Sequence, residues 1–194
     1  MTNTLRYLTH PQVRIDSAVP VPKWGLSDIG RERALSFAAA GILNSTKVIV
    51  SSAETKAIET AEIISDVIKT PIKIVENTHE NDRSATGFLE SAEFESVADL
   101  FFRHSHDSIR GWEPAIDAQS RIVRETKTII ETYKGLDILM VGHGAVGTLL
   151  YCHLAELEIN RDHDQPGGGG NMFSYDLDNQ SVVHSWKSIE NLMP

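Results

Sequence analysis

The chain has 194 residues, of which 41% are hydrophobic, enough for one domain with a sizeable core. Its formal net charge of -9, from 27 acidic and 18 basic residues, disfavours binding to nucleic acid or to anionic membrane surfaces. No run of about 18 apolar residues and no signal-like N-terminus occurs, so we expect a cytoplasmic protein that does not span a membrane. The single cysteine, Cys152, lies in an apolar segment and is expected to pack in the core.

Short apolar runs of strand length alternate with amphipathic stretches, a pattern typical of α/β proteins. In the first half of the chain, one helix is predicted to begin after Ser27, a good N-cap, and to stop at Gly41. A second helix is predicted over residues 55–68, where apolar residues recur at steps of three and four. The expected strands of this half lie near residues 5–8, 47–51 and 72–75.

The second half begins with a long insertion at about residues 77–114, which we expect to carry a helix and to cover the site. The later elements expected from the pattern are helices over 91–102, 115–133 and 145–154 and strands over 138–142, 172–176 and 182–188. Together these elements predict a single domain over residues 1–194. We expect it to fold as a three-layer α/β sandwich whose mostly parallel central sheet is flanked by helices.

Two histidines each follow a predicted strand directly. His10 ends the segment LRYLTH at residues 5–10, and His143 ends ILMVGH at residues 138–143. Because open α/β sheets present ligands at the carboxyl ends of their strands, we expect the two imidazoles to lie close together. Such a pair can supply a nucleophile and an electrophilic partner for phosphoryl transfer. A lone histidine at a strand end is more often structural, so the pair carries the prediction.

A third strand end lies in SSAETKAIETA at residues 51–61, where a strand leads into a helix whose first turn carries Lys56. Helix N-termini attract anions, and lysine adds a point charge. The glycines on either side of His143 would let a ligand approach the backbone closely. The three strand ends therefore predict one anion-binding pocket. Four glycines at residues 167–170 either form a further backbone nest for an anion or let the chain cross the sheet tightly.

The order and spacing of these motifs resemble the histidine phosphatase superfamily, with its phosphoglycerate mutase-like fold, over nearly the whole chain. That family begins with a strand and Arg-His-Gly, followed by a Leu-Thr/Ser-x-x-Gly-x-x-Gln/Glu-Ala helix. Next come Ser-Ser-x-x-x-Arg-Ala-x-x-Thr-Ala, an acidic segment and a late Gly-His strand end. Here LSDIGRERA at residues 26–34 keeps the glycine and the alanine of the helix, and residues 51–61 follow the serine motif.

The chain departs from the family pattern within the pocket. Thr9 stands where the family has arginine, Pro11 replaces the glycine, and Lys56 occupies the position of the second arginine. Arginine binds phosphate oxygens through a planar fork, whereas lysine offers one compact charge, so both forked donors are missing. Arg14 and Arg83 are the residues expected to restore positive charge.

The resemblance implies that neutral His10 attacks phosphorus and becomes phosphohistidine, which water then hydrolyses. It implies no metal and no other cofactor. His143, most effectively when protonated, and Lys56 would stabilise charge on the phosphoryl oxygens. The further residues that we expect to bind phosphate are Thr9, Arg14 and Arg83.

The same mechanism needs a carboxylic acid that protonates the leaving alcohol. Glu80 is the first choice and Asp82 the second, both in the segment HENDR at residues 79–83. Counting back from Gly87 as in the family would put Arg83 at the acid position, so the choice requires a local insertion.

The resemblance thus implies a phosphomonoesterase whose substrate is a small phosphorylated molecule or a phosphoprotein. A mutase is less expected, because the segments that hold both ends of a phosphoglycerate are not recognisable. The alternative is a noncatalytic, phosphoester-binding member of the same fold, although the chain retains both His10 and His143. Neither the substrate nor the oligomeric state follows from the sequence.

The sequence contains two further patterns, a pair of alternating histidines and a set of aromatic residues. His104 and His106 alternate like metal ligands, but they lie at the predicted solvated end of a helix, so no metal site is expected. Several aromatic residues, most of which we expect in the core, are candidates to line the mouth of the pocket: Trp24, Phe88, Phe101, Phe102 and Trp112.

Overall fold

The structure, a computed structural model, describes residues 3–193, which contain one six-stranded sheet in the order β3-β2-β4-β1-β5-β6. The neighbours β3, β2, β4 and β1 run parallel, β5 runs antiparallel to β1, and β6 antiparallel to β5. The strands are β1 (Thr4–Thr9), β2 (Val48–Ser51), β3 (Ile72–Ile74), β4 (Ile138–Gly142), β5 (Asn171–Asp176) and β6 (Ser181–Ser188). The predicted mostly parallel sheet is confirmed.

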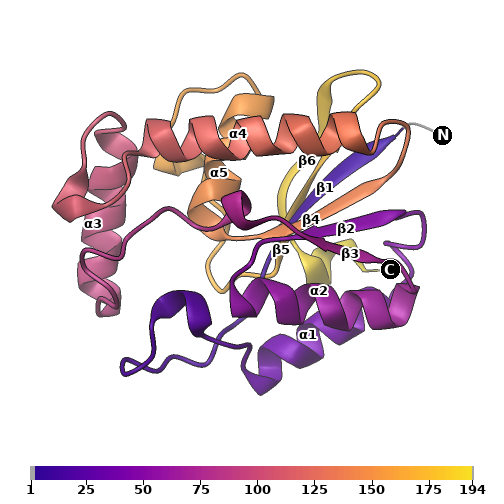
Figure 1. Ribbon diagram of the computed structural model, residues 1–194, viewed down its shortest axis with the longest axis horizontal. Coiled ribbons are helices and arrows are strands. Elements are labelled where there is room, and N and C mark those ends of the chain that lie inside the picture. The colour runs from indigo at the N-terminus through magenta and orange to yellow at the C-terminus, as the bar shows by residue number, and fades with distance from the viewer. Residues whose placement is uncertain (1–2, 194) are drawn as a thin grey trace.

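Helices cover both faces of this sheet, so the molecule has the three predicted layers (Figure 1). They are α1 (Asp28–Ala39), α2 (Thr55–Ile68), α3 (Ser91–Arg103), α4 (Ala115–Thr132) and α5 (Gly144–Leu154). In Figure 1, α1 and α2 lie below the sheet, α4 and α5 lie above it, and α3 stands apart at the left. Within residues 3–193 no helix is both long and apolar enough to cross a bilayer.

Alternation of side chains along the strands divides the apolar core between the two faces of the sheet. Leu5 and Tyr7 of β1 pack in the cluster that includes α4 and α5, whereas Leu8 packs in the cluster of α1 and α2. In β4, Ile138 and Met140 face the first cluster and Leu139 the second. Because both faces are covered, the central strand β4 is apolar and buried at every position, as is typical of parallel strands.

The helices follow the predicted boundaries within a few residues. Ser27 is the N-cap of α1, and its hydroxyl accepts a hydrogen bond from the Gly30 N–H at 3.1 Å. The segment predicted as an insertion, residues 77–114, carries α3. Its helix ends at Arg103, one residue past the expected end. Whether the chain acts as a single domain with that insertion stays a prediction.

The glycine run before β5 packs against the strand that carries His10. Gly168, Gly169 and Gly170 all have positive φ, and the Gly170 N–H donates to the His10 carbonyl at 3.0 Å. A Cβ on Gly169 would lie 2.4 Å from that carbonyl oxygen. Of the two interpretations of the run, the tight crossing of the chain is the one that these contacts support.

Because of this packing, the glycines of the run differ in how well they would tolerate a side chain. We expect Gly169→Ala to destabilise the protein by at least about 2 kcal/mol, through left-handed strain and the clash with a backbone atom. For a chain of this size, that loss lowers Tm by roughly 4–8 °C. Gly167→Ala is the matched control, because nothing lies within 4 Å of a Cβ there and its φ is ordinary. Thermal unfolding of both variants checks the difference, and equal Tm values would contradict it.

Candidate active site

His10 lies just past the end of β1, beside the end of β4. Its backbone N–H donates to the Gly142 carbonyl at 3.0 Å, because β1 and β4 pair in parallel with Thr9 opposite Gly142. The imidazole Nδ1 lies 2.8 Å from the Pro11 carbonyl oxygen. A carbonyl can only accept, so this contact assigns the proton to Nδ1 and leaves the lone pair on Nε2. His10 therefore has the tautomer that an attacking imidazole needs.

The environment of His10 also keeps its ring uncharged. Burial, with a smaller contribution from the Lys56 ammonium, lowers the pKa of His10 from 6.5 to about 4. His10 is thus neutral throughout the physiological pH range. A neutral imidazole with a free Nε2 is a nucleophile without any prior loss of a proton.

His143 is held rigidly beside His10, with ring centroids 5.4 Å apart. The Tyr7 hydroxyl accepts from the His143 N–H at 3.1 Å and donates to its carbonyl at 3.2 Å. Gly142 makes room for this clamp, since a Cβ there would lie 2.2 Å from the Tyr7 Oη. The His143 Nε2 lies 2.8 Å from the Ser52 Oγ. Burial lowers the pKa of His143 well below its usual range, so this ring is also neutral rather than protonated as the resemblance would favour.

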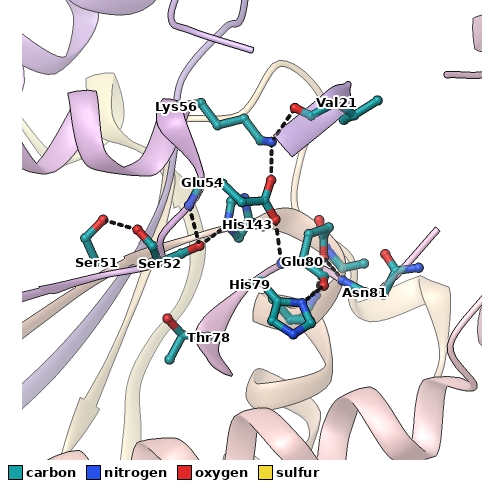
Figure 2. A network of polar contacts seen from close by, with 12 residues as sticks. Val21, Ser51, Ser52, Glu54, Lys56, Thr78, His79, Glu80, Asn81 and His143 are labelled. Carbon is teal, nitrogen blue, oxygen red and sulfur yellow. Dashed lines mark hydrogen bonds and ion pairs between the residues drawn. The ribbon is translucent and has the colours of Figure 1, made fainter. Parts of the chain in front are cut away.

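The buried carboxylate of Glu54 lies between His143 and Lys56 (Figure 2). Glu54 precedes α2, and its Oε2 accepts a hydrogen bond from the Lys56 Nζ. Its Oε1 lies 3.6 Å from the His143 Nε2 and accepts from the Glu80 N–H at 3.0 Å. Lys56, only 4% exposed, also donates to the Val21 carbonyl at 3.0 Å. The positive charge expected to bind phosphate is therefore compensated by Glu54.

Glu80 is anchored at the N-terminus of α5. Its Oε1 accepts from the Val146 N–H at 3.0 Å, and its Oε2 accepts from the Ala145 N–H at 3.1 Å. Burial raises the pKa of Glu80, against the opposing charge of Arg83 and the backbone donors. A carboxyl group that stays protonated to higher pH than usual is suited to donate a proton.

His10 and Glu80 line the same cavity of about 190 Å³, here called the inner cavity. One wall is aromatic and comes from α3 and the loop after it, namely Phe94, Phe101, Phe102 and Trp112. Of the aromatic residues considered in the sequence, Phe101, Phe102 and Trp112 thus belong both to the core and to this wall. Trp24 and Phe88 pack on each other instead, with ring centroids 5.6 Å apart.

A second cavity of about 460 Å³, the outer cavity, is lined by Glu54 and Glu80. Its remaining lining comes from the loop with Val21 and from residues 79–84. Glu80, Asn81 and Arg83 line both cavities.

Three uncommitted hydrogen-bond donors face the inner cavity. Arg83 lies over the Phe94 ring, with its guanidinium carbon 4.9 Å from the centroid, and pairs with no carboxylate among residues 3–193. The Asn81 Nδ2 is buried and lacks a partner within that range. Gln165 accepts at Oε1 from Thr9 and Asn171, while its Nε2 bonds to none of the described residues. These three side chains line the same cavity as His10.

The remaining predicted site residues lie elsewhere. The buried Thr9 hydroxyl donates to the Gln165 Oε1 at 2.7 Å, so Thr9 holds Gln165 at the cavity. Arg14 is exposed and lines neither cavity. Asp82 is exposed at the outer cavity, where the Ser84 N–H, through its hydrogen bond to Oδ1, lowers the pKa of Asp82. Arg83, and not Arg14, is therefore positioned to meet a ligand at His10.

Three residues of this site were missed in the sequence: Glu54, Asn81 and Gln165. Glu54 stands two residues before Lys56, but nothing in that spacing reveals that the two side chains pair. Gln165 precedes the glycine run, and only the fold brings it beside Thr9. Clusters of three or more His, Cys, Asp or Glu side chains suited to a metal do not occur among residues 3–193.

Comparison with known proteins places the chain in a family. The sequence profile of the histidine phosphatase superfamily, branch 1, matches residues 14–186 and so begins just past the altered motif at His10. No curated protein sequence matches significantly.

Solved structures of low sequence identity share the fold. A phosphoserine phosphatase from Entamoeba histolytica, solved with phosphoserine, has 16% identity and a TM-score of 0.78, covering 98% of this chain and 99% of its own. YhfR from Bacillus stearothermophilus has 20% identity and a TM-score of 0.77, with 94% and 95% covered. A mycobacterial glucosyl-3-phosphoglycerate phosphatase has 18% identity and a TM-score of 0.73, with 95% and 96% covered. With the profile matching most of its length, the chain belongs to the histidine phosphatase superfamily, branch 1.

Proposed function

We propose that the protein is a metal-independent phosphomonoester hydrolase that acts through a phosphohistidine on His10. The observation that carries the proposal is that a neutral His10, its Nδ1 bonded to Pro11, lines one cavity with a carboxyl group of raised pKa, Glu80. Family membership supports the same reaction class. The solved relatives named for phosphoserine and glucosyl-3-phosphoglycerate support a small phosphoester as substrate, and a phosphoprotein is the other class to test.

In the first step, the His10 Nε2 lone pair attacks phosphorus while the bond from phosphorus to the ester oxygen breaks. Glu80 gives its proton to the leaving oxygen, which departs as the alcohol. In the second step, water attacks the phosphohistidine, Glu80 takes one proton from it, and neutral His10 leaves with inorganic phosphate bound in the cavity. Arg83 and the amides of Asn81 and Gln165 stabilise the charge on the phosphoryl oxygens.

The direct test is phosphate release in metal-free buffer with a chelator. We expect release from p-nitrophenyl phosphate and from members of a panel that includes phosphoserine, 3-phosphoglycerate and a phosphopeptide. Turnover stopped in alkaline denaturant, where phosphohistidine survives, should leave one phosphoryl group on the peptide that contains His10, detected by mass spectrometry. Release that requires an added metal, or a phosphoryl group on another residue, would contradict the mechanism.

A second candidate is a noncatalytic, phosphoester-binding protein. The specific observation in its favour is the compensation of Lys56 by Glu54, which leaves Arg83 as the inner cavity's cation without a carboxylate partner among residues 3–193. Saturable binding of inorganic phosphate without release from any ester in the panel would establish this alternative.

The role of Arg83 can be separated from that of Arg14. We expect Arg83→Met to lower kcat/KM about 100-fold, because it removes a preorganised donor for the phosphoryl oxygens. Arg14→Met, which alters an exposed arginine outside both cavities, is the matched control and should stay within twofold of wild type. Steady-state kinetics with p-nitrophenyl phosphate checks both. A larger loss of kcat/KM in Arg14→Met than in Arg83→Met would show that Arg14, as expected from the sequence, supplies positive charge to the phosphate.

A further inference from the structure

The buried carboxylate of Glu54 has no role in the reaction steps above. It lies inside the site, bonded to the Lys56 ammonium and 3.6 Å from the His143 Nε2. Its other oxygen accepts from the backbone N–H of Glu80 at 3.0 Å. Lys56 and His143 are the two groups that the superfamily resemblance assigns to the phosphoryl oxygens. In Figure 2 the carboxylate of Glu54 stands between them.

The ionisation of Glu54 reinforces this arrangement. Burial alone would raise the pKa of Glu54, but the Lys56 ammonium bonded to its carboxylate and the backbone N–H of Glu80 outweigh burial and lower it. Glu54 is therefore ionised at neutral pH. A phosphate dianion near Lys56 would meet this charge at close range in a poorly solvated setting, where Coulomb repulsion is strong.

We propose that Glu54 is a specificity-determining residue, an internal anion that holds Lys56 and faces His143 in place of phosphoryl oxygens and so selects against phosphoryl groups with two negative charges. The inference rests on the proposed phosphate site at His10. A phosphoryl dianion can bind the Lys56 ammonium only if the ion pair between Lys56 and Glu54 breaks. A phosphoryl group with one charge is held by Arg83 and the amides alone and leaves that ion pair intact. The substrate class that fits best is therefore a phosphoester whose phosphoryl group reaches the site as a monoanion.

Calorimetric titration of the full chain with two probes tests this proposal. Inorganic phosphate at pH 8 is mainly a dianion, and dimethyl phosphate is a monoanion at any neutral pH. We expect Glu54→Gln to tighten phosphate binding at least about tenfold, since it removes one full charge at close range and releases Lys56. Binding of dimethyl phosphate should change less than threefold.

Two controls test whether the gain in phosphate affinity comes from the ion pair between Glu54 and Lys56. Glu59→Gln removes a carboxylate on the same helix that bonds to Arg31 and the Leu26 N–H, outside both cavities, and should leave both affinities unchanged. Glu54→Gln combined with Lys56→Gln should lose the gain in phosphate affinity, because the released ammonium is its source. If Glu54→Gln fails to fold, Glu54→Leu serves as the second variant, with the same direction expected.

Unchanged or weaker phosphate binding in the folded Glu54 variants would overturn the proposal. So would an equal gain for both probes, or a gain that survives the loss of Lys56. Because binding is measured without turnover, a protein that never releases phosphate yet shows the predicted gain would refute the proposed hydrolase function alone. A protein that turns over normally but shows no gain would refute only the role of Glu54.

Discussion

Replacing His10 with alanine is expected to lower phosphate release by at least about 10⁴-fold, because the reaction then lacks its nucleophile. The residual donors of the cavity still bind phosphate, so affinity for inorganic phosphate should fall by no more than a few-fold. Among residues 3–193 the imidazole has one hydrogen-bond partner, the carbonyl of the next residue, Pro11, so the fold should survive the change. Phosphate release and calorimetric phosphate binding, measured on the same preparation, check the two expectations.

His104→Ala is the matched control for His10→Ala. His104 is an exposed histidine at the C-terminal end of α3, so its loss should leave both turnover and binding at wild-type levels. A His10→Ala variant that retains more than a few per cent of wild-type activity, with an unchanged Tm, would show that another group attacks phosphorus.

Glu80→Gln is expected to have the next largest effect, and its size should depend on the leaving group. An alkyl phosphate needs a proton on its departing oxygen, so we expect kcat/KM, which reports the transfer to His10 and not the later hydrolysis, to fall about 1000-fold for such esters. p-Nitrophenolate leaves without that proton, and the loss for p-nitrophenyl phosphate should be about tenfold or less. Asp82→Asn, which alters the other candidate acid at an exposed position, should change neither rate. A uniform loss for both esters would assign Glu80 a structural role.

The pH profile follows from the same two groups. Attack requires neutral His10, whose pKa of about 4 places the acidic limb of kcat/KM near pH 4 instead of pH 6.5. Proton donation requires protonated Glu80, so the rate falls as pH rises through its raised pKa. The profile should be bell-shaped, with the pKa of His10 setting its acidic limb and that of Glu80 its alkaline limb. Glu80→Gln should abolish its alkaline limb, and an alkaline limb that persists in this variant would belong to another group.

The fold was predictable because its determinants are local. The N-cap at Ser27, the three- and four-residue steps of the helix over Thr55–Ile68, and the apolar runs of β1 and β4 each act within one element. Parallel neighbours then bring the ends of β1 and β4 together without further information, and His10 meets His143 as expected.

The charge balance of the site was not predictable in the same way. Lys56 is two residues from Glu54 in sequence, and helix periodicity alone would separate their side chains. They pair because Glu54 stands before the first turn of α2 in extended backbone and turns inward. Likewise, Thr9, which the resemblance places at the position of a family arginine, donates a hydrogen bond to Gln165, a residue 156 positions away. Such long-range compensation leaves no local signature.

Two hydrogen bonds hold the backbone of His10. The His10 N–H donates to the Gly142 carbonyl, and the His10 carbonyl accepts from the Gly170 N–H. A nucleophile fixed in this way loses little conformational entropy when it reaches the transition state, since the loss has already occurred during folding. A change of backbone conformation in the glycine run would restore the conformational freedom of His10. It would then slow the attack on phosphorus although no reacting atom has been altered. Substitutions at residues 168–170 should therefore change the activation entropy of the reaction more than they change the affinity for phosphate.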